Sequence, residues 1–91
     1  MSLTFGPISG NRNYLRIHDP GHSWLKVPIQ DVRNSGVFDK ITPYSYTKNG
    51  FMYLEEDSDM WTFYEAMLKL NVSVTVDNTN VDDFDEYLSN Q

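Results

Sequence analysis

The sequence contains no cysteine among its 91 residues. This absence excludes disulfide bonds, thiolate metal ligands and cysteine nucleophiles, and it favours an intracellular protein because small secreted domains usually need cross-links. No apolar run approaches the roughly 18 residues of a membrane-spanning helix, and residues 1–7 lack the features of a signal peptide. We therefore expect a cytoplasmic protein that does not enter a membrane.

The sequence also lacks the short motifs that mark common catalytic and nucleotide-binding sites. It has no G-x-S-x-G segment, no phosphate-binding loop, no dinucleotide fingerprint and no H-E-x-x-H segment. The positions of its serines do not pair any one of them with a base. We therefore expect a protein that is not an enzyme and that needs no cofactor.

Basic side chains are scarce in the second half of the chain. Residues 1–50 carry six basic and three acidic side chains, whereas residues 51–91 carry one basic and ten acidic side chains. The net charge of −6 argues against direct nucleic-acid binding, which depends on cationic contacts with phosphates. The acidic half pairs with the basic half on folding, stays a solvated surface, or attracts basic partners. The tail residues most suited to such attraction are Asp82, Asp83, Asp85 and Glu86.

The apolar residues that are present follow the patterns of short strands. Residues 14–18 and 23–27 alternate between apolar and polar side chains on either side of Asp19-Pro20-Gly21-His22, which is typical of a turn. These segments predict a β-hairpin. The residues expected to face the core are Leu15, Ile17, Leu25 and Val27.

A second hairpin is predicted around Asn49-Gly50. This dipeptide lies between two further alternating segments, residues 44–47 and 51–54. A two-residue type I′ turn needs positive φ at both central residues, which makes Asn-Gly a strong hairpin signal.

The spacing of apolar residues then predicts a main helix from Met60 to Leu70. Asp57 or Ser58 can cap its first turn, and neighbouring carboxylates suit the positive end of the helix dipole. Asn71 suits the left-handed conformation that often ends a helix. A shorter helix is expected after Pro28, because proline is favoured at the first helical position.

These elements predict an α+β fold in one domain that spans residues 1–91. Its sheet has about five mostly antiparallel strands, from the two hairpins and a closing strand at 72–76, with one main helix and one or two short helices. Residues 1–13 are expected to form a loose arm, and residues 14–76 the core. In the acidic tail, residues 77–91, apolar residues at helical spacing indicate either a short helix or a disordered segment. These residues are Val81, Phe84, Tyr87 and Leu88.

Three aromatic residues are candidates for a protein-interaction surface. If Leu25 and Val27 face the core, Trp24 lies on the opposite face of its strand, while Tyr44 and Tyr46 share one face of the second hairpin. Tyrosine and tryptophan are enriched at interaction hot spots. The alternative is that a helix covers this face of the sheet and makes the rings part of the core.

His18 and His22 flank the first turn, where two imidazoles and a carboxylate can approach a metal ion or act as acid and base. A zinc site needs three or four ligands, and no other ligand spacing is present, so ordinary surface histidines are the alternative. The segments 55–59 and 78–83 also offer oxygen ligands. Helix capping explains the first cluster, and the second lacks the glycine of a calcium loop.

Three blocks between His18 and Met67 carry a family resemblance. They are His18-Asp19-Pro20-Gly21-His22-Ser23-Trp24-Leu25, then Asp39-Lys40-Ile41 with Tyr44-Ser45-Tyr46, then Tyr53-Leu54-Glu55-Glu56-Asp57. In this order they resemble small uncharacterised proteins of bacteriophages and bacterial mobile elements. The resemblance implies a phage-type origin and brings no known activity or site residue.

We therefore expect a non-enzymatic interaction protein that acts in the cytoplasm of a bacterial host and binds a host or viral protein. In one version, the acidic half mimics nucleic acid and occupies a basic site on its partner. The alternative class is a small metal-binding protein or enzyme centred on His18 and His22. A minor virion or assembly component is a third possibility, and homo-oligomer formation is open.

Overall fold

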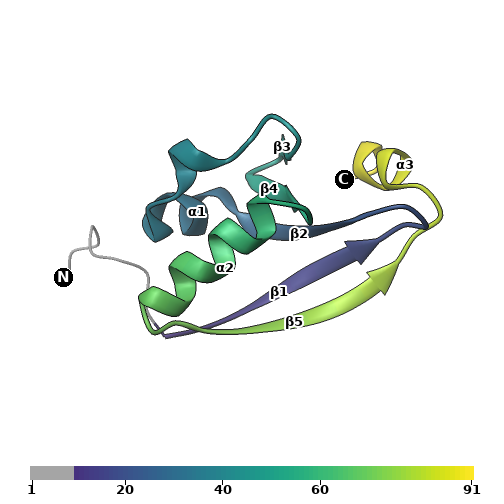
Figure 1. Cartoon of the computed structure of the whole chain (residues 1–91). Coiled ribbons are helices and arrows are strands. Elements are labelled where there is room, and N and C mark those ends of the chain that lie inside the picture. Colours follow the sequence, from purple (N-terminus) through teal and green to yellow (C-terminus); the bar gives the residue numbers. More distant parts are fainter. Residues whose placement is uncertain (1–9) are drawn as a thin grey trace.

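A computed structural model describes residues 10–91 of the protein. They form a five-stranded sheet in the order β3-β4-β2-β1-β5, with three α-helices and one 3-10 turn (Figure 1). The strands are β1 (Asn11–His18), β2 (Ser23–Pro28), β3 (Tyr46–Lys48), β4 (Phe51–Glu55) and β5 (Ser73–Asn80). The helices are α1 (Ile29–Ser35), α2 (Asp59–Lys69) and α3 (Phe84–Ser89), and the 3-10 turn is η1 (Phe38–Lys40).

Four strands of the sheet pair antiparallel and the fifth pairs parallel. β2 pairs with β1 and β4, and β3 pairs with β4. β5 lies parallel to β1, from Asn11 opposite Ser73 to His18 opposite Asn80. The predicted α+β fold, with five mostly antiparallel strands and one main helix, is therefore confirmed.

The second hairpin forms at the predicted turn. Asn49 and Gly50 have φ angles of 52° and 86°, and both values lie in the positive region that a type I′ turn requires. Lys48 and Phe51 pair directly across this turn. The strand before it begins later than predicted, at Tyr46.

The main helix and its end also follow the sequence pattern. α2 occupies Asp59–Lys69, close to the predicted bounds, and Asn71 adopts the expected left-handed conformation with φ of 59°. The tail forms a helix, α3, whose first residue Phe84 is buried. No helix within residues 10–91 has the length and apolar character needed to cross a bilayer.

Helices cover both faces of the sheet. α1 and α2 pack on one face, where Leu25 and Phe63 are buried, and Figure 1 shows both helices on the same side. On the other face, Phe84 of α3 packs against Trp24 and Tyr53. α3 lies at the end toward which β1 and β5 run (Figure 1). Because neither face stays polar, alternation in the sequence does not reveal which of the two faces the apolar residues of a strand occupy.

The four predicted core residues of the first hairpin do face the core, but they are divided between the two faces of the sheet. In the first hairpin Ile17 lies opposite Trp24, and Arg16 lies opposite Leu25. Opposite residues of an antiparallel pair share a face, so Leu15 and Ile17 face α3, while Leu25 faces α1 and α2. The register of the hairpin decides this, and a shift by one residue reverses the face.

On the face of the sheet that α1 and α2 cover, β1 contributes Tyr14 and not Leu15. Its ring meets Phe63 edge-on with centroids 5.6 Å apart, and its hydroxyl donates to Asp31 at 2.7 Å. Burial, together with the nearby Asp31 carboxylate, raises the pKa of Tyr14 above its usual range. A residue expected on the outer face is therefore part of the core.

The predicted ends of the core also differ from the structure. Residues 11–13, expected in the arm, belong to β1, and residues 77–80, expected in the tail, belong to β5. All of them pair in the parallel ladder between these strands. Backbone hydrogen bonding therefore extends both strands past the last apolar side chains. The rest of the expected arm, residues 1–9, lies outside the described residues.

Candidate interaction site

The three predicted aromatic residues line one pocket of about 440 Å³. Trp24 comes from β2, Tyr44 from the loop before β3, and Tyr46 from β3 itself. The turn from β4 into α2 adds three consecutive acidic residues, Glu55 to Asp57. Pockets that bind ligands usually measure about 300–1,000 Å³, so this one is large enough to take a small group or a side chain.

Trp24 forms a fixed wall of this pocket. It is buried, and its ring stacks on Phe84 of α3 with centroids 3.7 Å apart and an interplanar angle of 12°. The edge of the His22 ring approaches it, with centroids 6.0 Å apart. The expectation of an exposed Trp24 is therefore wrong. The alternative, that a helix covers this face of the sheet, is correct for Trp24, because α3 covers its ring.

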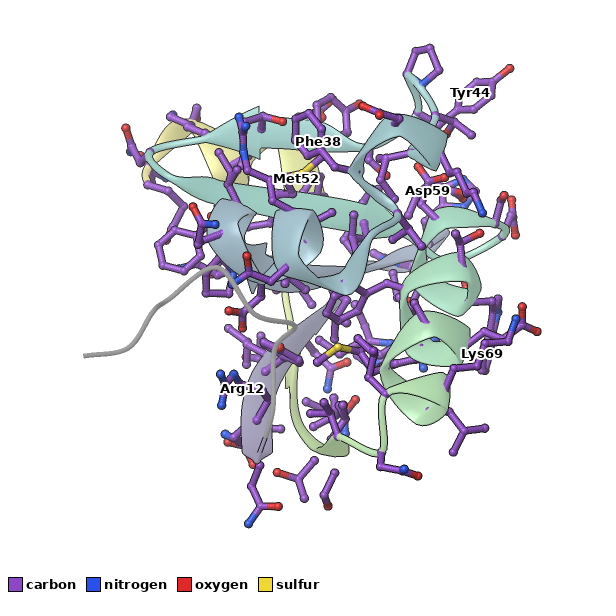
Figure 2. All side chains as sticks on the ribbon, turned by 90° about the vertical axis from the view of Figure 1, so that its left-hand side faces the viewer. Arg12, Phe38, Tyr44, Met52, Asp59 and Lys69 are labelled. Carbon is purple, nitrogen blue, oxygen red and sulfur yellow. The ribbon has the colours of Figure 1, made fainter. Side chains whose placement is uncertain are left out.

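Tyr44 and Tyr46 remain available to solvent. Tyr44 is 78% exposed and Tyr46 is 42% exposed, although the Tyr46 ring also lies 5.6 Å from that of Phe84. Figure 2 shows Tyr44 projecting outward from its loop, near the N-terminal end of α2, where Asp59 lies. These two tyrosines are the aromatic side chains of the pocket that a binding partner can cover.

A buried carboxylate holds the Tyr44 loop in place. Asp59, the first residue of α2, is fully buried. It accepts hydrogen bonds from the Thr42 backbone N–H at 3.0 Å, from the Thr42 hydroxyl at 2.7 Å, and from the Ser45 hydroxyl. Sequence reasoning missed this role, because the donors lie 17 and 14 residues away and no local signal connects them.

The cap of α2 also differs from the prediction. Neither Asp57 nor Ser58 supplies a capping side chain. Instead, the Glu55 carboxylate accepts from the backbone N–H groups of Asp57, Ser58 and Asp59 at 2.7, 2.8 and 3.1 Å. Glu55 is the last residue of β4, and its negative charge offsets the positive end of the α2 dipole.

Glu56 connects the acidic turn to β2. Its carboxylate accepts from the Ser23 backbone N–H at 3.0 Å and lies 3.4 Å from Nδ1 of His22. The Ser23 hydroxyl donates to the same carboxylate at 3.4 Å. One wall of the pocket is thus an ordered carboxylate.

Ser23, His22 and Glu56 meet here, but their arrangement is not that of an activated nucleophile. Within residues 10–91 no hydrogen bond joins the Ser23 hydroxyl to the His22 ring, which such a nucleophile requires. The hydroxyl is buried and accepts from Arg16 at 2.9 and 3.1 Å. The serine therefore links Arg16 to Glu56 as part of the structure.

The structure separates the two candidate metal ligands. Nε2 of His18 lies 2.8 Å from Oδ1 of Asn78 on β5, whereas His22 turns toward Glu56. Among the described residues no group of three or more His, Asp and Glu side chains is placed to hold a metal ion. The geometry gives no support to the metal hypothesis for His18 and His22.

Asp19, between the two histidines, ties the first turn to α3. Its carboxylate accepts from the backbone N–H groups of Gly21, His22 and Phe84 at 2.9, 2.8 and 3.2 Å. The bond from His22, with those from Gly21 and Phe84, lowers the pKa of Asp19 below its usual value. This carboxylate positions α3 against the pocket.

The four acidic residues predicted in the tail lie at the start of α3. Asp83 caps this helix, because its side chain accepts from the Asp85 backbone N–H at 3.0 Å. Asp82, Asp85 and Glu86 are exposed. Since Phe84 stacks on Trp24, these carboxylates belong to the segment that flanks the aromatic pocket.

Comparison of the chain with protein-family models, with curated proteins and with solved structures gives no match.

Proposed function

We propose that this protein is a non-enzymatic interaction module that binds a partner protein through the pocket of Trp24, Tyr44 and Tyr46. The observation that carries this proposal is that the three rings meet at one pocket while two of them stay exposed. Aromatic side chains supply much of the energy of protein interfaces, because they bury a large area at a small entropy cost. The burial of the core does not depend on Tyr44, so a binding role accounts for its position.

Acidic groups near the pocket add a second contribution to the proposed binding. They come from the turn Glu55 to Asp57 and from the start of α3, whose Phe84 touches Trp24. A negative surface speeds association with a basic partner and repels nucleic acid. In the sharper version of the proposal, the acids of α3 mimic phosphates and occupy a basic site on a nucleic-acid-binding protein.

The resemblance to bacteriophage proteins indicates where to look for the partner. A host or viral protein in the cytoplasm of a bacterium fits the proposal, and a role in virion assembly would differ only in which viral protein is bound. We therefore expect the partner to be present in lysates of infected or uninfected bacteria.

The test is affinity capture with the chain attached through its N-terminus, because α3, whose Phe84 stacks on Trp24 of the pocket, lies beside the C-terminus (Figure 1). The pocket variant combines Tyr44→Ala with Tyr46→Ala. The matched control combines Trp61→Ala with Leu68→Ala, which removes two exposed apolar side chains from α2. We expect the pocket variant to bind the captured partner at least about tenfold more weakly than wild type, and the control to bind normally.

The contribution of the acids is measured on the same captured partner. The variant Asp82→Asn, Asp85→Asn, Glu86→Gln leaves Asp83 in place, because Asp83 caps α3. We expect weaker binding with a smaller dependence on salt concentration. Equal capture by the pocket, acid and control variants, each folded as judged by thermal unfolding, would contradict the proposed function.

A further inference from the structure

We propose that the pocket accepts an arginine side chain of the partner protein, an inference that rests on the proposed function. Three features of the lining support this choice of ligand. They are the negative charge of the pocket, the occupied N–H groups at the start of α2, and the aromatic walls.

The charge of the pocket favours a cation. Three carboxylates, Glu55 to Asp57, line it, and among the described residues no lysine or arginine does. His22 is the basic group in this lining, and it lies 3.4 Å from Glu56. Arg16 does not line the pocket, and it donates to the Ser23 hydroxyl, which in turn donates to Glu56. A cationic group therefore meets a negative and accessible lining.

The start of α2 does not make this pocket an anion site. A free helix N-terminus attracts anions through its unpaired N–H groups. Here the Glu55 carboxylate already accepts from the N–H groups of Asp57 and Ser58, which line the pocket, and from that of Asp59, the first residue of α2, at 3.1 Å or less. A phosphate or carboxylate would find these donors in use and a negative charge beside them.

The aromatic walls favour arginine over lysine. The guanidinium group is planar, stacks on aromatic rings, and is more weakly hydrated than the ammonium group of lysine. Its five N–H groups can reach the remaining acceptor positions of Glu56 and the exposed carboxylate of Asp57. The exposed ring of Tyr44 and the buried ring of Trp24 give the stem of the side chain apolar surface to contact.

The test uses three capped pentapeptides, Gly-Ser-X-Ser-Gly, in which X is arginine, lysine or citrulline. Citrulline keeps the shape of arginine and removes its charge. Each peptide is titrated into ¹⁵N-labelled full-length protein, and the amide signals of Tyr44, Tyr46 and Glu56 and the indole signal of Trp24 are followed. We expect saturable shifts with the arginine peptide, and binding at least about tenfold weaker for citrulline.

A matched pair of variants tests the carboxylate. Glu56→Gln removes the charge and keeps an oxygen that can accept from Ser23, whereas Glu65→Gln changes an exposed residue of α2 outside the pocket. We expect Glu56→Gln to weaken arginine binding by about three- to tenfold and Glu65→Gln to leave it unchanged. If Glu56→Gln perturbs the fold, Asp57→Asn replaces it, because Asp57 is exposed.

Each outcome decides the assignment. Equal shifts with arginine and citrulline, tighter binding of lysine, or no shifts up to about 10 mM peptide would overturn it. If a partner protein is captured through Tyr44 and Tyr46 but the arginine peptide fails, the proposed function stands and the arginine assignment does not. Saturable arginine binding without any captured partner supports the ligand class and removes the proposed function.

Discussion

At the scale of single residues, the stability of the candidate site depends on Asp59. This residue does not line the pocket, yet it is fully buried and accepts from Thr42 and Ser45, on either side of Tyr44. Hydrogen bonds to a buried charged acceptor are strong, and removal of the acceptor leaves the partly buried donors of Thr42 and Ser45 unpaired. The position of Tyr44 is therefore a consequence of a core carboxylate.

We predict that Asp59→Ala lowers the free energy of unfolding by about 2–4 kcal/mol, because it leaves the Thr42 and Ser45 donors without an acceptor. Urea unfolding followed by tryptophan fluorescence measures this change. Asp57→Ala is the control, since Asp57 is exposed, and its effect should stay within about 0.5 kcal/mol. Equal effects of the two substitutions would show that Asp59 does not hold the loop.

The sequence identifies the aromatic residues of the site better than it identifies their supports. Trp24, Tyr44 and Tyr46 can be selected from residue type and strand position, and they do meet at one pocket. The burial of Trp24 is not predictable, because it depends on α3. The roles of Asp59 and Glu55 also escape prediction, since acidic residues around a helix start are equally compatible with capping, tertiary hydrogen bonds and simple exposure.

At the scale of elements, α3 joins the site to the sheet. It is a helix of six residues, too short to be stable alone, and it depends on the burial of Phe84 against Trp24 and Tyr53. Asp19 accepts from the N–H of Phe84 at 3.2 Å, and Lys48 donates to the carbonyl of Leu88 at 2.8 Å. The start of α3 is therefore tied to the turn between β1 and β2, and its end is tied to β3.

We predict that Phe84→Ala lowers the free energy of unfolding by about 3–5 kcal/mol, because Phe84 is fully buried against Trp24 and Tyr53. In a Trp61→Phe background, where Trp24 is the remaining tryptophan, its fluorescence should shift to the red as solvent reaches the ring. Leu68→Ala is the control, because Leu68 is 74% exposed. Unchanged stability and fluorescence would contradict the docking of α3.

Local signals predict the elements well, and their pairing less well. The Asn49-Gly50 turn and the spacing of α2 are encoded in neighbouring residues, and both are confirmed. The face of β1 is not encoded locally, because it follows from the register of the first hairpin. The length of β5 is not encoded either, since its polar end, residues 77–80, is held by pairing with β1 at a distance in the sequence.

At the scale of the whole molecule, the two halves of the chain do not neutralise each other. Within residues 10–91 the ion pairs are Arg12 with Asp31 and His22 with Glu56, so no lysine or arginine of the first half pairs with an acid of the second. Lys26 instead lies over the Phe51 ring at 4.3 Å. Of the alternatives that the charge pattern allows, the fold therefore does not pair the lysine and arginine side chains of the first half with the acids of the second half. Apart from the buried Asp59, the acids of the second half are exposed or partly exposed, where a basic partner can meet them.

The most direct test of the central claim is site-specific photo-crosslinking in bacterial lysate. The photoreactive amino acid p-benzoylphenylalanine replaces Tyr44 in one sample and Trp61, exposed on α2 and outside the pocket, in the other. The proposed interaction surface predicts a discrete covalent adduct with one protein at position 44 and none at position 61. An adduct at position 61 with none at position 44 would contradict the account, because the partner would then bind α2 and not the aromatic pocket.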